Sequence, residues 1–183
     1  MKILALDSSG LVASVAVVEN DTLLAEYTVN YKKTHSQTLL PMLDEISNMT
    51  ELDLSTIDAI AVAGGPGSFT GLRIGSATAK GLGLALEKPL ISIPTTAAIA
   101  YNIWDTDKFV CPIMDARRNQ VYTGVYCYTD HRLDTVWEQD TMSIEALAEG
   151  LNCLDHEVIF LGDGVAVYRE KLEALLTIPF SFA

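Results

Sequence analysis

The sequence contains little cysteine, and the cysteines it has are not paired. Cys111, Cys127 and Cys153 are odd in number and widely spaced, and no CxxC pair occurs. This pattern supports neither a disulfide framework nor a zinc knuckle. We therefore expect buried free thiols in a reducing cytosol.

Histidine is equally scarce, and the common catalytic motifs are missing. His35, His131 and His156 never lie at the spacing that puts two imidazoles on one helical face. The chain also lacks HExxH, a GxSxG elbow and a P-loop lysine. His35 stands near the start of a predicted helix, where a polar cap or a solvent-facing position is favoured over a ligand role. We expect no metal site and no intrinsic cofactor.

Positive charge is the third shortage. Lys and Arg number 12 against 24 Asp and Glu, which gives a formal net charge of −12. Binding of free nucleic acid depends on neutralising phosphates with cationic side chains. The chain alone is therefore a poor candidate for nucleic-acid binding.

Long apolar runs are also missing. None approaches the roughly 20 residues needed to span a bilayer. The N-terminus carries one lysine, a short apolar run and then Asp7, which does not fit a signal peptide. We expect a cytoplasmic protein with no membrane contact.

The most informative stretch that is present covers residues 57–87. An apolar run over 57–63 predicts a buried strand, the string GGPGSFTG follows, and a helix is predicted over 70–87. Ser68 or Thr70 suits the N-cap, because a hydroxyl there can accept a hydrogen bond from a free helical N–H. This order is typical of a helix N-terminus that meets a ligand or a tightly packed neighbour.

The predicted helix carries small residues at every fourth position. Each interior glycine costs about 1 kcal/mol relative to alanine, so several of them indicate close approach by another backbone. We expect this stripe and the apolar stripe of a helix predicted over 34–49 to bind a partner protein, with Arg73 bridging to a partner carboxylate or fixing the loop. Packing within the chain is the alternative. The expected interface comprises Leu39, Leu43, Ile46, Gly71, Arg73, Gly75 and Ala79.

The order of the predicted elements divides the chain into two similar halves. The first half has strands over 3–6, 13–18, 23–29, 57–63 and 90–93 and helices over 34–49, 70–87 and 97–104. The second has strands over 110–116, 121–128, 133–138 and 158–161 and helices over 143–151 and 167–176. Polar residues near 102–108 separate the halves, so we expect lobes over 1–103 and 104–183.

Four strings resemble one known family. ILALDSS, THSQTLLPMLDE and GGPGSFTGLRIG, and more loosely MDARRNQVYTGVY, are similar to segments of the TsaB family of bacterial tRNA-modification proteins. The resemblance implies an α/β protein of the actin-like ATPase fold (ASKHA, ribonuclease H-like), with two βββαβα-type lobes of mixed sheets flanked by helices. Because family members tend to be longer, and because Phe180 and Phe182 stand beside the end, we expect an incomplete second lobe.

The resemblance also implies a function. Family members support a TsaD-type catalytic subunit and a TsaE-type ATPase, which form threonylcarbamoyladenosine on N6 of adenosine 37 in tRNAs that read codons beginning with A. We expect a non-catalytic activator that meets tRNA only in the complex, leaves ATP to its partners, and forms a heterodimer or a homodimer through the two helices named above. The alternative is a nucleotide-binding or metallopeptidase-like enzyme of the same fold.

Two turns carry further expectations. Asp7, Ser8 and Ser9, with Gly67 and Ser68 of the glycine loop, stand where kinases of this fold bind nucleotide phosphate. Ser stands where those relatives usually place Gly, so a vestigial phosphate turn competes with an ordinary polar hairpin. The basic stretch at residues 117–122 is the one local reversal of charge; it suits contact with RNA or a nucleotide, or a solvated turn equally well.

Overall fold

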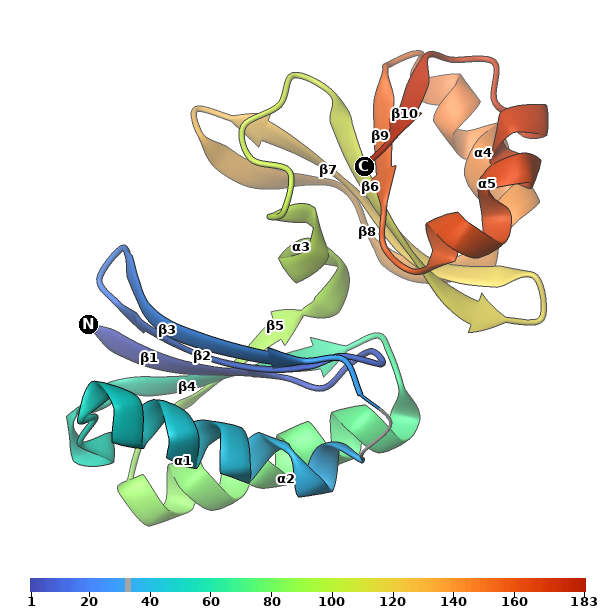
Figure 1. Ribbon diagram of the computed structural model, residues 1–183. Helices are drawn as coiled ribbons and strands as arrows, with labels where there is room; N and C mark the ends of the chain where they lie inside the picture. Colours follow the sequence, from blue (N-terminus) through green and yellow to red (C-terminus); the bar gives the residue numbers. More distant parts are fainter. Residues whose placement is uncertain (32–33) are drawn as a thin grey trace. The chain divides into compact units, whose positions relative to one another are not determined.

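The computed structural model describes residues 1–31 and 34–183 (Figure 1). Contacts within the chain divide it into two compact units, unit 1 at Met1–Thr95 and unit 2 at Thr96–Ala183. Each unit holds one five-stranded mixed sheet with helices packed against it. Among the described residues, no helix is both long and apolar enough to cross a membrane.

The sheet of unit 1 begins with an antiparallel meander and continues with parallel strands. Its strand order is β3-β2-β1-β4-β5. β1 pairs antiparallel with β2 and parallel with β4, and β4 pairs parallel with β5. The strands are β1 (Lys2–Asp7), β2 (Ala13–Glu19), β3 (Thr22–Val29), β4 (Ala59–Gly65) and β5 (Leu90–Pro94).

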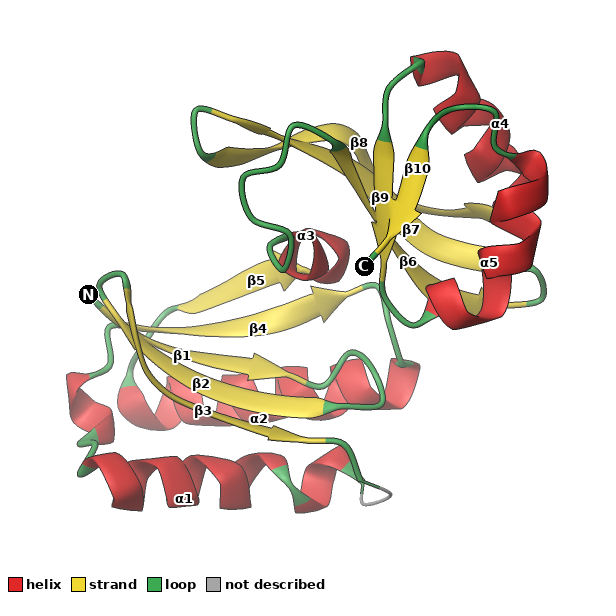
Figure 2. Ribbon diagram, turned by 45° about the horizontal axis from the view of Figure 1, so that its top comes forward, coloured by secondary structure: helices red, strands yellow, loops and turns green. Residues whose placement is uncertain are grey.

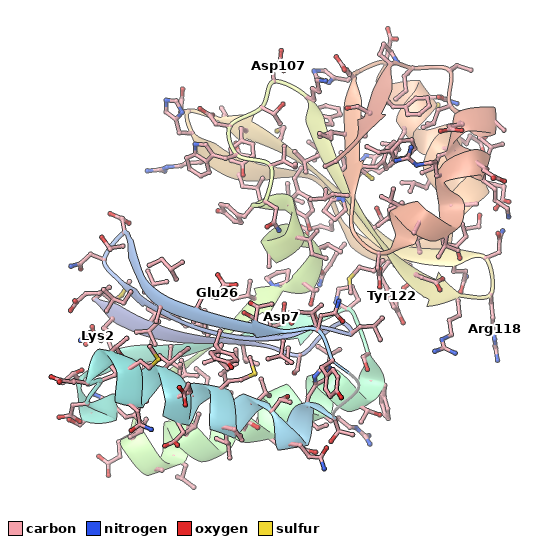
Figure 3. All side chains as sticks on the ribbon, viewed as in Figure 1. Lys2, Asp7, Glu26, Asp107, Arg118 and Tyr122 are labelled. Carbon is pink, nitrogen blue, oxygen red and sulfur yellow. The ribbon has the colours of Figure 1, made fainter. Side chains whose placement is uncertain are left out.

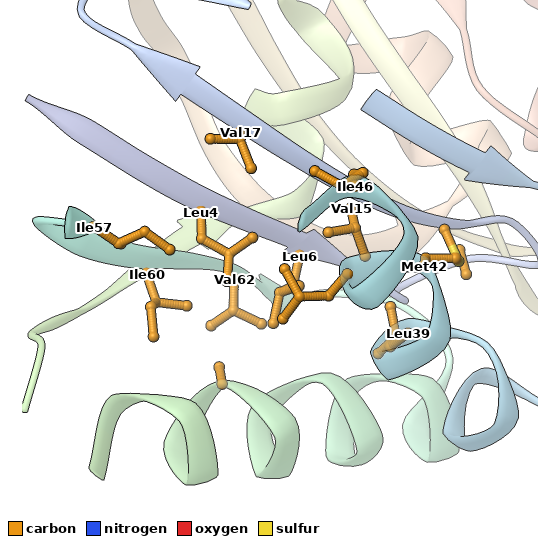
Figure 4. Packing of buried hydrophobic residues seen from close by; sticks show 13 residues of the cluster. Leu4, Leu6, Val15, Val17, Leu39, Met42, Ile46, Ile57, Ile60 and Val62 are labelled. Atoms are coloured by element: carbon orange, nitrogen blue, oxygen red, sulfur yellow. The ribbon is translucent and has the colours of Figure 1, made fainter. Parts of the chain in front are cut away.

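Two helices, α1 (Leu39–Thr50) and α2 (Phe69–Leu86), cover one face of this sheet (Figure 2). A 3₁₀ turn, η1 (His35–Gln37), precedes α1. Because α1 begins at Leu39, Pro41 falls in the first turn, where its missing N–H removes no helical hydrogen bond. Figure 4 shows Leu6 and Val62 between the sheet and the helices, in the apolar core of the unit.

Unit 2 repeats this plan. Its strand order β10-β9-β6-β7-β8 is the order of unit 1 read from the other end, with β6 antiparallel to β7 and parallel to β9. The helices α4 (Ile144–Leu154) and α5 (Gly164–Leu175) stand in the chain where α1 and α2 stand in unit 1. The strands are β6 (Phe109–Arg117), β7 (Gln120–Thr129), β8 (Arg132–Ser143), β9 (Val158–Leu161) and β10 (Phe180–Phe182).

The predicted helix over 97–104 is wrong in its bounds. Helix α3 (Thr95–Ala100) begins earlier and ends sooner. Ala97, Ile99 and Ala100 pack with Val110 and Tyr126 of unit 2. For this reason the contacts divide the chain at residues 95 and 96, before the boundary that the sequence predicts at 103 and 104.

Strand β10 was not predicted. Its three residues pair parallel with β9, and the rings of Phe180 and Phe182 lie 6.4 and 5.8 Å from that of Phe160. The two aromatic residues beside the chain end therefore have a structural role in the core of unit 2. Helix α1 begins five residues later than predicted and β8 ends five residues later, and the other strands and helices lie within about three residues of their predicted bounds.

Candidate functional site

The turn after β1 is fastened to the N-terminus of α2. The Ser8 hydroxyl donates to the carbonyl oxygen of Gly71 over 2.8 Å, and the backbone N–H of Ser68 donates to the carbonyl oxygen of Ser9 over 2.6 Å. The Ser9 N–H donates in turn to Asp7 Oδ1 over 2.7 Å. Ser8 and Ser9 are almost fully buried. The structure thus brings together the predicted turn residues and the glycine loop.

Ser68 begins α2, as one of the two predicted caps. Its hydroxyl oxygen accepts a hydrogen bond from the Gly71 N–H at 3.3 Å. His35 closes the other side of the turn, because its Nε2 donates to the carbonyl oxygen of Gly10 at 2.9 Å. A hollow of about 270 Å³ opens beside these groups and is lined in part by His35 and Thr70.

Glycine is required at three positions where α2 and the loop before it meet the turn after β1. A Cβ at Gly71 would lie 2.0 Å from the Ser8 carbonyl oxygen, and one at Gly75 would lie 2.4 Å from Ser8 Oγ. At Gly67, whose φ is +156°, a Cβ would lie 2.4 Å from the Ser9 carbonyl oxygen. The atoms that approach these glycines, the backbone of Ser8 and Ser9 and the hydroxyl of Ser8, therefore belong to this chain.

This finding corrects the predicted partner interface. Six of its seven residues, all except Arg73, are buried inside unit 1, with their contacts made to the sheet, the turn and each other. The physical reason is that α2 packs closely against the sheet and the turn of its own unit. This outcome is the alternative that the sequence left open, packing within the chain. The six are Leu39, Leu43, Ile46, Gly71, Gly75 and Ala79.

The outward face of α2 has a different character. Phe69 is 69% exposed and Leu84 is 84% exposed, while the Arg73 guanidinium lies over the Phe69 ring at 3.9 Å from its centroid. Ala77 and Gly81 between them are exposed, and a Cβ at Gly81 would meet no atom within 4 Å. We call these five residues the α2 outer stripe. The sequence has two series of residues at four-residue spacing on this helix, one with Gly71 and Gly75 and one with Ala77 and Gly81. The sequence alone does not show which of the two series faces outward.

The closed turn limits what unit 1 can do with a phosphate. Phosphate turns work by offering free backbone N–H groups to the anion. Here the Ser9 N–H is held by Asp7, the Ser68 N–H is held by Ser9, and the Ser8 hydroxyl is held by Gly71. Three donors of the predicted phosphate turn are therefore already bonded, two of them between the turn and the start of α2, and phosphate binding there stays a prediction.

The corresponding turn of unit 2 is built differently. Asp115 lies near the end of β6, two residues before its last residue, and its Oδ1 accepts hydrogen bonds from the Arg117 N–H at 2.9 Å and the Tyr168 hydroxyl at 3.0 Å. Asn119 at the tip donates to both carboxylate oxygens of Glu145 at 3.1 and 2.9 Å. These hydrogen bonds lower the pKa of the Glu145 carboxyl, with Asn119 as the main cause. Sequence analysis missed Glu145, because nothing in its spacing ties it to the turn.

Metal-ligating side chains do not gather in the described part of the chain. No group of three or more His, Cys, Asp or Glu residues there is arranged to hold an ion. Cys111 is fully buried, and burial raises the pKa of its thiol to about 12 against a hydrogen bond from Thr123 that lowers it. Cys153 is exposed, contrary to the expectation that the thiols are buried.

Two mixed sheets of identical strand order, each with a pair of helices, define the actin-like ATPase fold of the ribonuclease H-like class. The crystal structure of the ethanolamine utilization protein EutJ from Carboxydothermus hydrogenoformans shares this fold, with a TM-score of 0.58 at 13% identity. A crystal structure of an uncharacterized protein from Pseudomonas aeruginosa, described as similar to the peptidase YeaZ, is much more alike. Its TM-score is 0.85 at 28% identity, covering 100% of this chain and 83% of the other.

Sequence comparison gives the family. The profile of the TsaD family, tRNA N6-adenosine threonylcarbamoyltransferase, matches residues 22–181. The tRNA threonylcarbamoyladenosine biosynthesis protein TsaB of Bacillus subtilis is 35% identical over 176 residues, which cover 96% of this chain and 77% of that protein. TsaB of Escherichia coli is 32% identical over 170 residues, covering 90% and 72%. This chain belongs to the TsaB family.

Proposed function

We propose that this protein takes part in threonylcarbamoyladenosine formation on tRNA as the non-catalytic partner and activator of a TsaD-type subunit. Membership of the TsaB family is the observation that carries the proposal, since the curated relatives are named for this pathway. The product is the modified adenosine 37 of tRNAs that read codons beginning with A. The protein would act in the cytoplasm, where tRNA is modified.

The match to the TsaD family profile supports a shared fold with the catalytic subunit. The TsaD-type subunit would then carry out catalysis, and this chain would support it without catalysing a reaction. In this chain three donors of the turn and the glycine loop are engaged by Asp7, Ser9 and Gly71, which leaves fewer groups for a phosphate than an open phosphate turn would offer. A chain of this kind suits a scaffold that leaves ATP to a TsaE-type partner.

Calorimetry tests the non-catalytic part of the proposal. Titration of the isolated chain with ATP and Mg²⁺ should give no binding heat, because three donors of the turn are already bonded. A TsaE-type ATPase titrated under the same conditions serves as the positive control. Tight ATP binding by this chain would favour the alternative, a nucleotide-binding enzyme of this fold.

The partner surface we propose is the α2 outer stripe, in place of the buried residues that the sequence suggested. Phe69 and Leu84 expose large apolar side chains that a partner could cover. Gly81 lies between them with open space above it, although a glycine there weakens the helix by about 1 kcal/mol. A foreign helix could approach closely at this point, and Arg73 could bridge to its carboxylates.

A bulky residue at the open glycine tests this surface. Gly81→Leu would hold the two backbones apart and cost about 1–3 kcal/mol of binding, roughly tenfold to a hundredfold in affinity for the TsaD-type partner. Ala146→Leu is the matched control, because Ala146 is an exposed helical residue of unit 2. Unchanged partner affinity in Gly81→Leu, with normal folding, would rule out the stripe as the interface.

The same stripe would also serve a homodimer. Two copies that bury their outer stripes against each other compete with the heterodimer, so the free protein should dissociate when the partner is added. Sedimentation of the chain alone and with the partner measures this exchange. In Gly81→Leu both assemblies should weaken together, whereas a homodimer that survives the substitution must use another face.

A further inference from the structure

The turn of the hairpin between β6 and β7 has a backbone conformation that is unfavourable for two of its residues. Arg117, Arg118 and Asn119 all have left-handed backbone angles, with φ of 65°, 52° and 63°. Left-handed φ is disfavoured for a residue with a long side chain, and two-residue hairpin turns prefer Asn, Asp or Gly there. The β2–β3 and β7–β8 turns place Asn20 and Asp130 at their first left-handed position, although His131, with φ of 63°, takes the second position of the β7–β8 turn.

The tip is nevertheless held firmly. Asp115 fixes the backbone before it through the Arg117 N–H, and Asn119 fixes its far side. The Asn119 side chain donates to Glu145 on α4 and accepts from the Lys171 ammonium group on α5, and Lys171 also lies 3.5 Å from Glu145. The acidic groups near the tip are therefore committed to internal partners.

The two arginine side chains have no such partner. Within residues 1–31 and 34–183, neither Arg117 nor Arg118 forms an ion pair or a side-chain hydrogen bond, and both are exposed. Figure 3 shows Arg118 extending away from the end of the hairpin. A strained turn that presents two uncommitted guanidinium groups has no evident use inside the fold, which points to a ligand outside it.

We propose that Arg117 and Arg118 contact the phosphate backbone of tRNA while the protein is bound to its catalytic partner. This inference rests on the proposed function. A guanidinium fork matches phosphate oxygens well, and its charge does not depend on pH in the physiological range. The chain as a whole carries a net charge of −12, so its other surfaces would repel RNA, and the protruding pair of arginines is where it can lie against the polyanion.

Binding of labelled substrate tRNA to the reconstituted assembly, measured by anisotropy across a salt series, tests the contact. Arg118→Ala should raise Kd about threefold and reduce the slope of log K against log salt by about 0.7–0.9, the effect of one lost phosphate contact. Arg117→Ala/Arg118→Ala should raise Kd on the order of tenfold and reduce the slope about twice as much. Arg132→Ala removes one exposed charge at the next hairpin turn and should change neither quantity.

A glycine variant separates binding from folding. Arg117→Gly/Arg118→Gly relieves the backbone angles, so it should fold at least as stably as the natural chain while losing tRNA affinity as the alanine variant does. Arg117→Lys/Arg118→Lys keeps the charge and should preserve the salt slope. If the glycine variant binds tRNA normally, the arginines do not contact it and the inference is wrong.

The remaining outcomes identify other ligands. If the double alanine variant binds the TsaD-type partner more weakly in the absence of tRNA, the arginines pair with protein carboxylates and the RNA contact is refuted. If it loses only binding of free nucleotide, the phosphate belongs to a nucleotide and the RNA contact is again refuted. If leaving out this chain changes neither tRNA affinity nor modification, both the proposed function and the tRNA contact are refuted. If the complex needs the chain but binds tRNA normally with the arginine variants, only the contact is refuted.

Discussion

Alanine at Gly75 and alanine at Gly81 should have opposite effects on stability, although both glycines are interior residues of α2. At Gly75 a Cβ would lie 2.4 Å from Ser8 Oγ, so the hydroxyl must leave its hydrogen bond to Gly71. At Gly81 a Cβ would meet nothing within 4 Å. The same substitution therefore tests which face of the helix meets the turn.

The magnitudes follow from three contributions. Alanine improves helix propensity by about 1 kcal/mol at either position. At Gly75 this gain is outweighed by a lost buried hydrogen bond, about 1–3 kcal/mol, and by overpacking of similar size. We expect Gly75→Ala to lower the free energy of unfolding by about 1–5 kcal/mol and Gly81→Ala to raise it by about 1 kcal/mol.

A double variant isolates the contact itself. Ser8→Ala removes the atom that a Cβ at Gly75 would strike, and the nearest remaining neighbours, Val62 Cγ2 and Ser8 Cβ, lie at 3.6 and 3.7 Å, which is ordinary contact. Ser8→Ala/Gly75→Ala should therefore be more stable than Gly75→Ala alone, so the two changes are not additive.

Urea unfolding followed by far-UV circular dichroism measures these differences. Tryptophan fluorescence adds a control, because Trp104 and Trp137 both lie in unit 2 and report on that unit. If Gly75→Ala is as stable as the natural chain while Gly81→Ala is weakened, then α2 faces the other way and the description of the site is wrong.

Three further predictions concern single groups. Ser68→Ala should lower the free energy of unfolding by about 1 kcal/mol, because the Gly71 N–H loses its cap, and an unchanged urea midpoint would refute the cap. Cys111 should resist alkylation in the folded protein at pH 8 while exposed Cys153 reacts, and mass spectrometry of the labelled peptides would show the reverse if the burial were wrong. Burial raises the pKa of the Cys111 thiol from its ordinary value of 9.0 to about 12, so the thiol's contribution to stability is complete below pH 9 and declines by about 1.4 kcal/mol per pH unit from there towards pH 12. The difference in unfolding free energy between the natural chain and Cys111→Ala should show this decline, and a difference independent of pH would contradict it.

Hydrophobic periodicity was sufficient to predict most of the fold. The apolar runs at 3–6 and 110–116 were predicted to be the first strands of the two halves. In the structure they form β1 and β6, each the first strand of its unit in the chain and the central strand of its sheet. The sequence narrowed the cap of α2 to Ser68 or Thr70, since such a signal is local, and the structure shows Ser68 in that place.

The site was harder to predict, because it depends on which side of a helix meets the sheet. Gly75 and Gly81 have the same local signal, and only the position of Ser8 distinguishes them. Strand β10 was missed for a related reason: three residues carry too little pattern, and their pairing with β9 is set by the sheet already in place. The contacts of Asn119 with Glu145 and Lys171 likewise join segments that are distant in sequence.

The central claim is that this chain activates a TsaD-type subunit without catalysing a reaction itself. The most direct measurement is threonylcarbamoyladenosine formation in a mixture of a TsaD-type subunit, a TsaE-type ATPase, the threonylcarbamoyl adenylate donor and tRNA, with and without this chain. We predict that the modification is lost or greatly reduced when the chain is left out and returns when it is added back, while the chain alone modifies nothing. Full activity without the chain, or modification by the chain alone, would contradict the account.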